Sequence, residues 1–407
     1  MALSSTQAQG LLKKAYDPKV PEQQVFSRFP FFTMVKKRTG AGGESWTVPC
    51  IYAANVRAGT NFTSASAVTE TAPAAKFELP YGNLYGVSSV DGKVFAQTGD
   101  AKKQAEAFMP IIIERAKSTT KTVSKLAALY LSRSSTGSIG QIATTTTVAS
   151  TTIVLTNPSD QYNFEEGMQI QLVATDGGTL RSAGATALIS TIPGDGTLIL
   201  SAVLTSTIAA AATGDFIVNV GDNNHGIAGL ASWAPLATSK GTFAGVNRDL
   251  SPRKLAGLYV DASALSLTVD AGVSRALNTM KANEGNCTHV FMNPIDYEAL
   301  CQTGSTQVVA EAGEEREFGF KAVSFVSDGS KARVIEDATF PAGQAWLVNM
   351  ANIEYVYAGS EIDYLDQDGQ TWLRVGGSDS YEMRIGAYPA GLAVKNPGRS
   401  LCVVKLY

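Results

Sequence analysis

The feature that most constrains the fold is a pair of strand-like segments separated by a long stretch too polar to build a core. Residues 45–52 and 76–87 are rich in β-branched and aromatic side chains, while residues 53–75 are mostly small or polar. This pattern predicts a long hairpin that projects from the body. An isolated two-stranded ribbon is only marginally stable in water. We therefore expect the hairpin to lie either on its own domain or on a neighbouring subunit.

The segment before this hairpin is locally basic. Between Met1 and Gly40, Asp17 and Glu22 are outnumbered by cations: Lys13, Lys14, Lys19, Arg28, Lys36, Lys37 and Arg38. The same segment contains apolar residues, namely Val25, Phe26, Phe29, Phe31 and Phe32. Its prolines exclude one long helix, and its apolar content is high for a free tail. We expect an N-terminal arm, residues 1–41, that lies extended across another surface.

The basic arm is the one charge feature with a functional meaning, and three interpretations remain open. It could contact nucleic acid through phosphates without reading sequence. It could also pair with acids on a neighbouring copy, such as Glu311, Glu314, Glu315 and Glu317. Finally, it could be an ordinary solvated segment.

A long amphipathic helix is predicted over residues 100–131. Asp100 is a suitable cap, and Pro110 should end a first short helix or kink the whole. Apolar residues then recur at helical spacing: Ile112, Ala116, Val123, Leu126, Ala127 and Tyr130. We expect one packed face along this helix.

An abrupt change of composition marks residues 139–222, which are rich in Thr, Ala, Ile, Val and Gly and poor in Lys and Arg. Short, turn-bounded apolar runs indicate strands at 152–155, 168–174, 187–192, 197–202 and 216–220. This spacing predicts a small all-β barrel or sandwich. The polar, Gly-rich borders at 138–140 and 221–226 are typical of an inserted domain joining its host.

Helices and strands alternate in the remaining residues, 227–407. Helices are predicted at 267–281 and 294–300, the second with Asn293 as its cap and Pro294 in its first turn. Strands are predicted at 289–292, 322–326, 345–349, 354–357, 371–375, 381–388, 392–395 and 401–406. The chain is therefore expected to have an α+β fold.

Residues that carry chemistry are scarce. Only His225 and His289 could serve a Cys-His or Ser-His-Asp site, and the alternation of Cys287 and His289 on one predicted strand indicates packing. The four scattered cysteines offer no zinc spacing. The run Asp363, Asp366, Asp368, Gly369 is more typical of a turn than of a calcium loop. We predict no catalytic, metal or cofactor residue and no enzyme activity.

The overall charge argues against a large electrostatic footprint. Charged residues make up 17 % of the 407-residue chain and the net charge is −3, which leaves little field to gather nucleic acid or an acidic membrane. The start lacks the pattern of a secretory signal, and no apolar run is long enough to cross a bilayer. We expect a cytoplasmic product with reduced thiols and no membrane partner.

The order of these segments resembles that of the major capsid proteins of tailed bacteriophages with the Hong Kong 97-type fold. The residues that carry the resemblance are 43–49, the helix 106–131 with Gly137-Ser138-Ile139-Gly140 after it, 243–248, 289–294 and 379–388. Each is a weak pattern, and their shared order makes the resemblance moderately specific. It covers nearly the whole chain except the insertion.

The resemblance implies a domain organisation. Residues 1–41 would be the N-terminal arm, 42–96 the extended loop, 97–139 with 351–407 the peripheral domain and its spine helix, 140–222 an inserted β-domain, and 223–350 the axial domain. The sequence departs from some members of that family in two ways. The chain runs from Met1 almost directly into the arm, so scaffolding is expected from a separate protein. Lys76 is the only lysine of the hairpin, so crosslinking between subunits is not expected.

The resemblance also implies a function and partners. Hexamers and pentamers of the chain would form the icosahedral or prolate head shell around double-stranded DNA, assembled in the host cytoplasm and retained in the virion. A scaffolding protein and a portal would be partners, with a decoration protein as an optional further one, and the inner face would contact DNA non-specifically. Two other classes remain open: a tail-tube or surface-layer subunit, and an enzyme with a carbohydrate-binding barrel.

Overall fold

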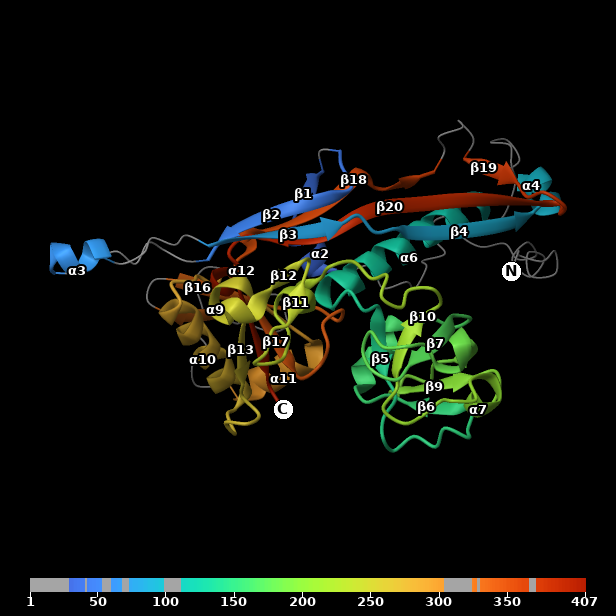
Figure 1. The fold of residues 1–407 in the computed structure, drawn as a ribbon. Helices are drawn as coiled ribbons and strands as arrows, with labels where there is room; N and C mark the ends of the chain where they lie inside the picture. Colours follow the sequence, from blue (N-terminus) through green and yellow to red (C-terminus); the bar gives the residue numbers. More distant parts are fainter. Residues whose placement is uncertain are drawn as a thin grey trace, which may run out of the picture.

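The computed structural model describes residues 29–40, 42–52, 60–67, 73–98, 111–303, 324–327, 330–365 and 371–407. Figure 1 shows a long sheet along the top of the molecule, a long helix beneath it, and two separate lobes below. Helices and strands are mixed, as the sequence predicts. The hairpin leaves the body at one end of the long sheet (Figure 1).

The long sheet is built around one exceptionally long strand, β20 (Ser380–Val394). On one side β20 pairs antiparallel with β4 (Leu84–Asp91), and on the other with β18 (Ile353–Tyr364) and β19 (Trp372–Arg374). Strand β1 (Lys36–Thr39) adds to β18 in parallel. The two segments predicted at 381–388 and 392–395 are thus parts of a single strand. A short helix, α4 (Gly92–Thr98), follows β4.

Helix α6 (Ile111–Ser132) covers the face of this sheet that points toward the lobes. A Cβ on Gly86 of β4 would lie 2.5 Å from Val123 Cγ2 and 2.8 Å from Thr119 Cγ2, so the helix packs directly on the glycine. The helical pattern predicted from the sequence is confirmed from Ile111 onward. Its first part, residues 100–110, lies outside the described residues.

The predicted hairpin is formed by β2 (Ser45–Ile51) and β3 (Ala74–Pro80), in a register that pairs Ser45 with Pro80 and Ile51 with Ala74. A short helix, α3 (Phe62–Ala67), lies between the two strands in sequence. The prediction of one strand over 76–87 was wrong. That segment divides after Pro80, and its second half joins β20 as β4. At the break, the Gly82 N–H donates to the Pro389 carbonyl at 2.8 Å.

The lobe below α6 holds a six-stranded sheet, which we call the β lobe (residues 138–219). Its strand order is β5 (Ser138–Gln141), β10 (Phe216–Asn219), β7 (Gln169–Val173), β8 (Ala187–Thr191), β9 (Thr197–Leu200) and β6 (Thr152–Val154). Short helical turns, η1 (Pro158–Asn163), η2 (Arg181–Gly184) and α7 (Leu204–Thr207), connect them. Residues 138–140, which the sequence indicates as a polar, Gly-rich border of the insertion, belong to strand β5, and Ile139 is fully buried in the lobe.

Three polar contacts join the β lobe, or Asp222 just after it, to the last turns of α6 and to Arg133, which follows the helix. Arg133 donates to Asp160 at 2.6 Å, and both side chains are nearly buried. The Tyr130 hydroxyl donates to Asp222, and Lys125 pairs with Glu165. Because one partner of each pair lies on or next to the helix, the lobe is held where the helix ends.

The second lobe contains a mixed six-stranded sheet, which we call the mixed lobe. Its strand order is β13 (Leu258–Asp261), β21 (Leu401–Lys405), β17 (Gln344–Val348), β14 (His289–Met292), β16 (Ser330–Glu336) and β15 (Ser324–Ser327). Its helices are α9 (Pro252–Leu255), α10 (Val269–Ala282), α11 (Pro294–Thr303) and α12 (Pro397–Ser400). The sequence grouped residues 351–407 in one unit, whereas backbone pairing divides them between the long sheet and this lobe.

The close approach of α6 to β4 generates a prediction. Gly86→Ala is expected to lower the free energy of unfolding by about 1–3 kcal/mol, because the added methyl overpacks against Thr119 and Val123. Urea denaturation of the unassembled subunit measures this change. Gly376→Ala is the matched control, since a Cβ there would meet nothing within 4 Å. Equal midpoints for the two variants would contradict direct packing at Gly86.

Candidate assembly surfaces

The base of the projecting hairpin is buried in the chain's own core. Val48 and Cys50 of β2 and Phe77 and Leu79 of β3 all point to one face and are at most 5 % exposed. The Phe77 ring lies 4.9 Å from that of Trp233, in α8 (Leu230–Trp233). The Trp233 indole N–H donates to the Leu392 carbonyl of β20 at 2.7 Å. The base is therefore anchored on the chain's own long sheet.

The tip of the hairpin has the opposite character. Helix α3 lies well away from the body (Figure 1), and the side chain of Phe62 at its start is 87 % exposed. Ile51, the last residue of β2, is 72 % exposed. Of the two surfaces that the sequence left as alternatives, the chain's own domain is the one that supports the base. The tip offers apolar side chains to the outside.

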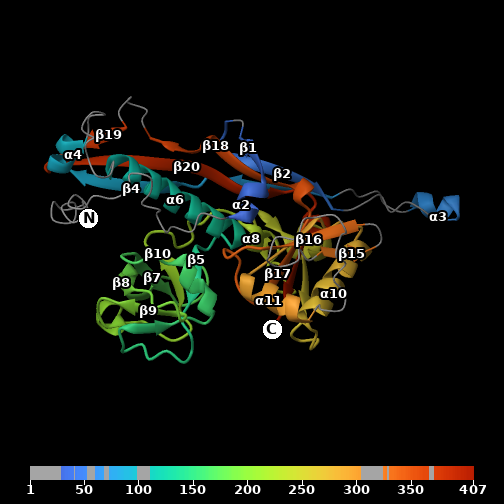
Figure 2. The same cartoon turned by 180° about the vertical axis from the view of Figure 1, so that it is seen from behind.

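The described end of the arm folds into the chain's own core. Helix α2 (Pro30–Met34) lies beneath the long sheet beside α6 (Figure 2). Phe31 is 1 % exposed, with its ring 5.1 Å from that of Phe291 and 5.5 Å from that of Phe340. The Phe31 N–H donates to the buried Asp337 carboxylate at 3.0 Å. The prediction that this part of the arm lies extended across another surface was therefore wrong.

The cations of the described arm are paired within the chain. Lys36 and Arg38 of β1 lie 3.5 and 3.0 Å from the Glu354 carboxylate, which Lys395 approaches to 3.3 Å. Lys37 pairs with Glu361 at 2.5 Å. These three arm cations do not need acids on a neighbour, which corrects that interpretation for them. The remaining cations, Lys13, Lys14, Lys19 and Arg28, and the acids Glu311, Glu314, Glu315 and Glu317 lie outside the described residues.

Glu354 is the centre of this ion cluster, and its protonation follows from two opposing effects. Burial raises the pKa of its carboxyl group, but hydrogen bonds and charges from Arg38 and Lys395 outweigh burial and hold the pKa below its usual value. The carboxylate consequently stays ionised at neutral pH. It joins the arm strand β1 to both β18 and the end of β20.

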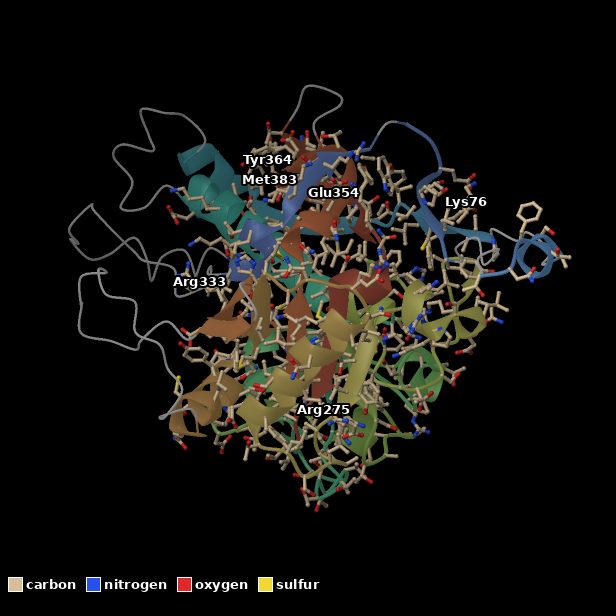
Figure 3. The ribbon with its side chains drawn as sticks, turned by 90° about the vertical axis from the view of Figure 1, so that its left-hand side faces the viewer. Lys76, Arg275, Arg333, Glu354, Tyr364 and Met383 are labelled. Atoms are coloured by element: carbon tan, nitrogen blue, oxygen red, sulfur yellow. The ribbon has the colours of Figure 1, made fainter. Side chains whose placement is uncertain are left out.

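The outer face of the long sheet carries an apolar strip. Tyr85 and Val87 of β4 point away from α6 and are 53 % and 58 % exposed. The Tyr85 ring packs edge-on against Tyr388 of β20 at 6.3 Å. The long sheet lies away from the mixed lobe: in Figure 3, Tyr364 of its strand β18 is near the top of the molecule, and Arg275 of the mixed lobe is near the bottom. This strip and the hairpin tip are apolar surfaces that a neighbouring chain could cover.

A cavity of about 500 Å³ lies where α2, α6, the β lobe and the mixed lobe meet. Its lining includes Phe29, Leu129, Tyr162, Pro294 and Asp337. Sequence reasoning missed this cavity because its lining comes from five distant segments. No sequence motif connects them.

The residues considered for catalysis are in states that oppose it. Burial raises the pKa of the Cys287 thiol to about 12, and the thiol donates to the His289 backbone carbonyl at 3.3 Å. Burial and the nearby Arg333 lower the pKa of His289, whose Nδ1 lies 3.0 Å from the Thr288 hydroxyl. A protonated thiol bonded to a carbonyl is the reverse of an activated nucleophile.

Only one residue of the candidate calcium loop can be placed. Asp363 lies in β18, while Asp366, Asp368 and Gly369 fall outside the described residues. Within the described ranges, no group of three or more His, Cys, Asp or Glu side chains is arranged to hold a metal ion. No helix in the same ranges is long and apolar enough to cross a membrane.

The ion cluster generates a pH-dependent prediction. Glu354→Gln is expected to lower the free energy of unfolding at pH 7 by about 1–3 kcal/mol, discounted toward the lower value because its cation partners are half exposed. Since the folded-state pKa of Glu354 is depressed, its contribution is present above the unfolded pKa and is lost as pH falls through the folded pKa. The difference between wild type and variant should shrink below about pH 4.5.

Urea denaturation at pH 7 and pH 4 measures this difference. Glu284→Gln serves as control, because Glu284 pairs with Arg399 at an exposed position and should contribute little at either pH. A Glu354→Gln effect that is equal at both pH values would contradict the ionised cluster.

The fold is similar to that of capsid chains of known structure. No family model matches the sequence, and no curated protein matches it. A chain of the cyanophage A-1(L) capsid asymmetric unit is 12 % identical and matches with a TM-score of 0.57 over 99 % of this chain and 98 % of its own length. A chain of the capsid of the native GTA particle is 11 % identical and matches with a TM-score of 0.53 over 100 % and 99 %.

These matches cover the arm end, hairpin, helix α6 and both lobes together, in the order in which the sequence presents them. At such low identity they establish the fold. The prediction of a capsid-type fold, made from segment order, is confirmed. The chain has the Hong Kong 97-type fold of phage capsid proteins.

Proposed function

We propose that this chain is the major capsid protein of a tailed bacteriophage. Copies of it assemble into hexamers and pentamers that form the icosahedral or prolate head shell around double-stranded DNA. The observation that carries the proposal is the hairpin, whose base is buried in its own chain while its tip exposes Phe62 far from the body. A tip of this kind is stable and useful only when another molecule covers it.

The domain roles follow from the same proposal. Residues 97–139 and 351–407 act as the peripheral domain, apart from β21, which pairs within the sheet of the mixed lobe. Residues 223–350 act as the axial domain, 140–222 as an inserted β-domain and 42–96 as the extended loop. Head-to-tail contacts between such subunits close into rings when the rotation permits. Many interfaces of ordinary size then stabilise the shell together.

The partners are proposed on the same basis. The chain's main partner is itself, with a separate scaffolding protein, a portal and, as an optional further partner, a decoration protein. DNA is contacted non-specifically on the inner face, and assembly takes place in the host cytoplasm before the protein resides in the virion. A structural role fits the protonated, buried state of Cys287 better than an enzymatic one. A tail-tube or surface-layer role is less well supported, since the whole-length matches are chains of capsids.

Removing the tip tests the proposal without disturbing the base. Tyr52 and Pro73 are the last facing residues of the hairpin, joined by a hydrogen bond from the Tyr52 N–H to the Pro73 carbonyl at 3.2 Å. Replacing residues 53–73 with Asn-Gly-Thr closes the strands by a two-residue turn and removes Pro73, which has no N–H to donate the hydrogen bond that such a turn needs. We expect the shortened chain to keep the wild-type unfolding midpoint and to yield at least tenfold fewer closed shells in negative-stain micrographs, because each subunit loses its contact with the next.

A point variant at the tip supplies a milder test. Phe62→Ser should also reduce shell yield, whereas Leu265→Ser, which changes an exposed apolar residue between β13 and α10 of the mixed lobe, serves as its control. Shells of normal size and number from the shortened chain would refute the role of the tip.

A further inference from the structure

The loop that supports the hairpin base is organised around the guanidinium group of Arg248. Arg248 is 5 % exposed and donates to the backbone carbonyls of Ser232 at 2.6 Å, Gly241 at 3.3 Å and Lys240. Its guanidinium also lies over the Phe243 ring, 5.1 Å from the centroid. Only the planar, five-donor group of arginine can meet carbonyls in several directions at once. The loop from Ser232 to Arg248 is thus closed around a single side chain.

This loop carries a small hairpin that touches the projecting one. Strands β11 (Thr242–Phe243) and β12 (Val246–Asn247) are joined by Ala244 and Gly245, which have φ values of 48° and 81°. Such a turn favours glycine at its second position. The Ala244 carbonyl accepts a hydrogen bond of 3.1 Å from the Glu78 N–H of β3. The turn therefore holds the backbone of the projecting hairpin directly.

Phe243 completes the support by joining two aromatic rings that belong to different parts of the fold. Its ring lies 5.1 Å from Trp233 and 6.3 Å from Phe77 of β3. Trp233 is in turn bonded to β20 through the Leu392 carbonyl. A continuous series of contacts therefore runs from β20 through Trp233 and Phe243 to β3, with Arg248 behind it.

The charge of Arg248 is costly where it lies, which argues against a role in stability alone. Burial lowers the pKa of Arg248 to about 10. Burial and the charge of Arg248 lower that of the neighbouring Lys240 to about 8. Two buried cations side by side destabilise a fold relative to apolar residues of similar volume. What arginine offers in exchange is a fixed loop geometry.

We infer that Arg248 is a positioning residue, which sets the direction in which the β2–β3 hairpin leaves the body by holding the Ala244 turn and Phe243 against β3. The inference rests on the proposed role of the hairpin in shell assembly, and it identifies Arg248 as the residue that orients the hairpin before the subunits assemble. A two-stranded ribbon bends easily at its base, so this support determines where the tip carries Phe62. The partner that receives the tip is a second copy of the chain.

Hydrogen exchange of the unassembled full-length chain, followed by mass spectrometry, tests the inference. Arg248→Lys keeps the charge but loses the fork of donors. We expect peptides covering β2 and β3 to exchange at least tenfold faster, while peptides covering β14, β17 and β21 keep wild-type rates. Arg275→Lys, the same change at an exposed position on α10 (Figure 3), should leave every rate unchanged.

A second variant keeps the test decisive if Arg248→Lys folds poorly. Phe243→Leu leaves the guanidinium in place but removes the ring contacts with Trp233 and Phe77, and it should accelerate exchange in β2 and β3 selectively. Unchanged rates in the hairpin would overturn the inference, and so would equal acceleration in all sheets, which indicates a purely structural role. The measurement requires no particles, so its outcome is independent of whether the chain forms shells.

Discussion

Strand β20 is the element on which the rest of the structure depends. It runs for 15 residues, from Ser380 to Val394, and pairs with β4 on one edge and with β18 and β19 on the other. Its Leu392 carbonyl receives the Trp233 indole N–H, and Lys395 just beyond its end reaches Glu354. The positions of the hairpin base, the arm strand β1 and helix α6 are therefore all fixed relative to this one strand. Any change in its course would alter the relative directions of these parts.

The hairpin and the arm follow the same physical rule, in which apolar contacts of the chain with itself come first. The hairpin base and α2 bury Phe77 and Phe31, respectively, among aromatic rings of other segments. The described arm cations are neutralised by Glu354 and Glu361. Exposed apolar side chains remain at the hairpin tip and along the strip formed by Tyr85 and Val87. A chain of low charge thus presents surfaces suited to neighbouring proteins.

Sequence reasoning succeeded where the local pattern decided the structure. Period-two alternation identified β2, helical spacing identified α6 from Ile111 and α10, and the Asn293-Pro294 pair marked the start of α11. It failed where a segment changes partners, because alternation continues across Pro80 while the backbone leaves β2 for β20. It also failed at Phe31 and Phe32, whose partners lie more than 250 residues away in sequence.

At the projecting hairpin, too, one part could be predicted from the sequence and another could not. The existence of a projecting hairpin was predictable, because residues 53–75 cannot form a core. Its support was not predictable, because Arg248 stands in the sequence as one cation among 33 and acquires its role only from carbonyls that the fold brings around it. The cavity between α2, α6 and the two lobes could not be predicted from the sequence for the same reason, since its lining residues are neighbours only in space.

By itself, the sequence determined the order of the segments, the positions of the main helices and most strands, and through that order the class of fold. Local periodicity and turn chemistry act over a few residues, so they can be read without knowing the rest of the chain. Only the tertiary structure decided which part of the hairpin is buried and which part is exposed. It also decided which charged side chains form ion pairs within the chain, and that the last strand, β21, pairs within the mixed lobe. These outcomes depend on contacts between segments that are distant in sequence. Such contacts form, and contribute to stability, only when the chain has folded.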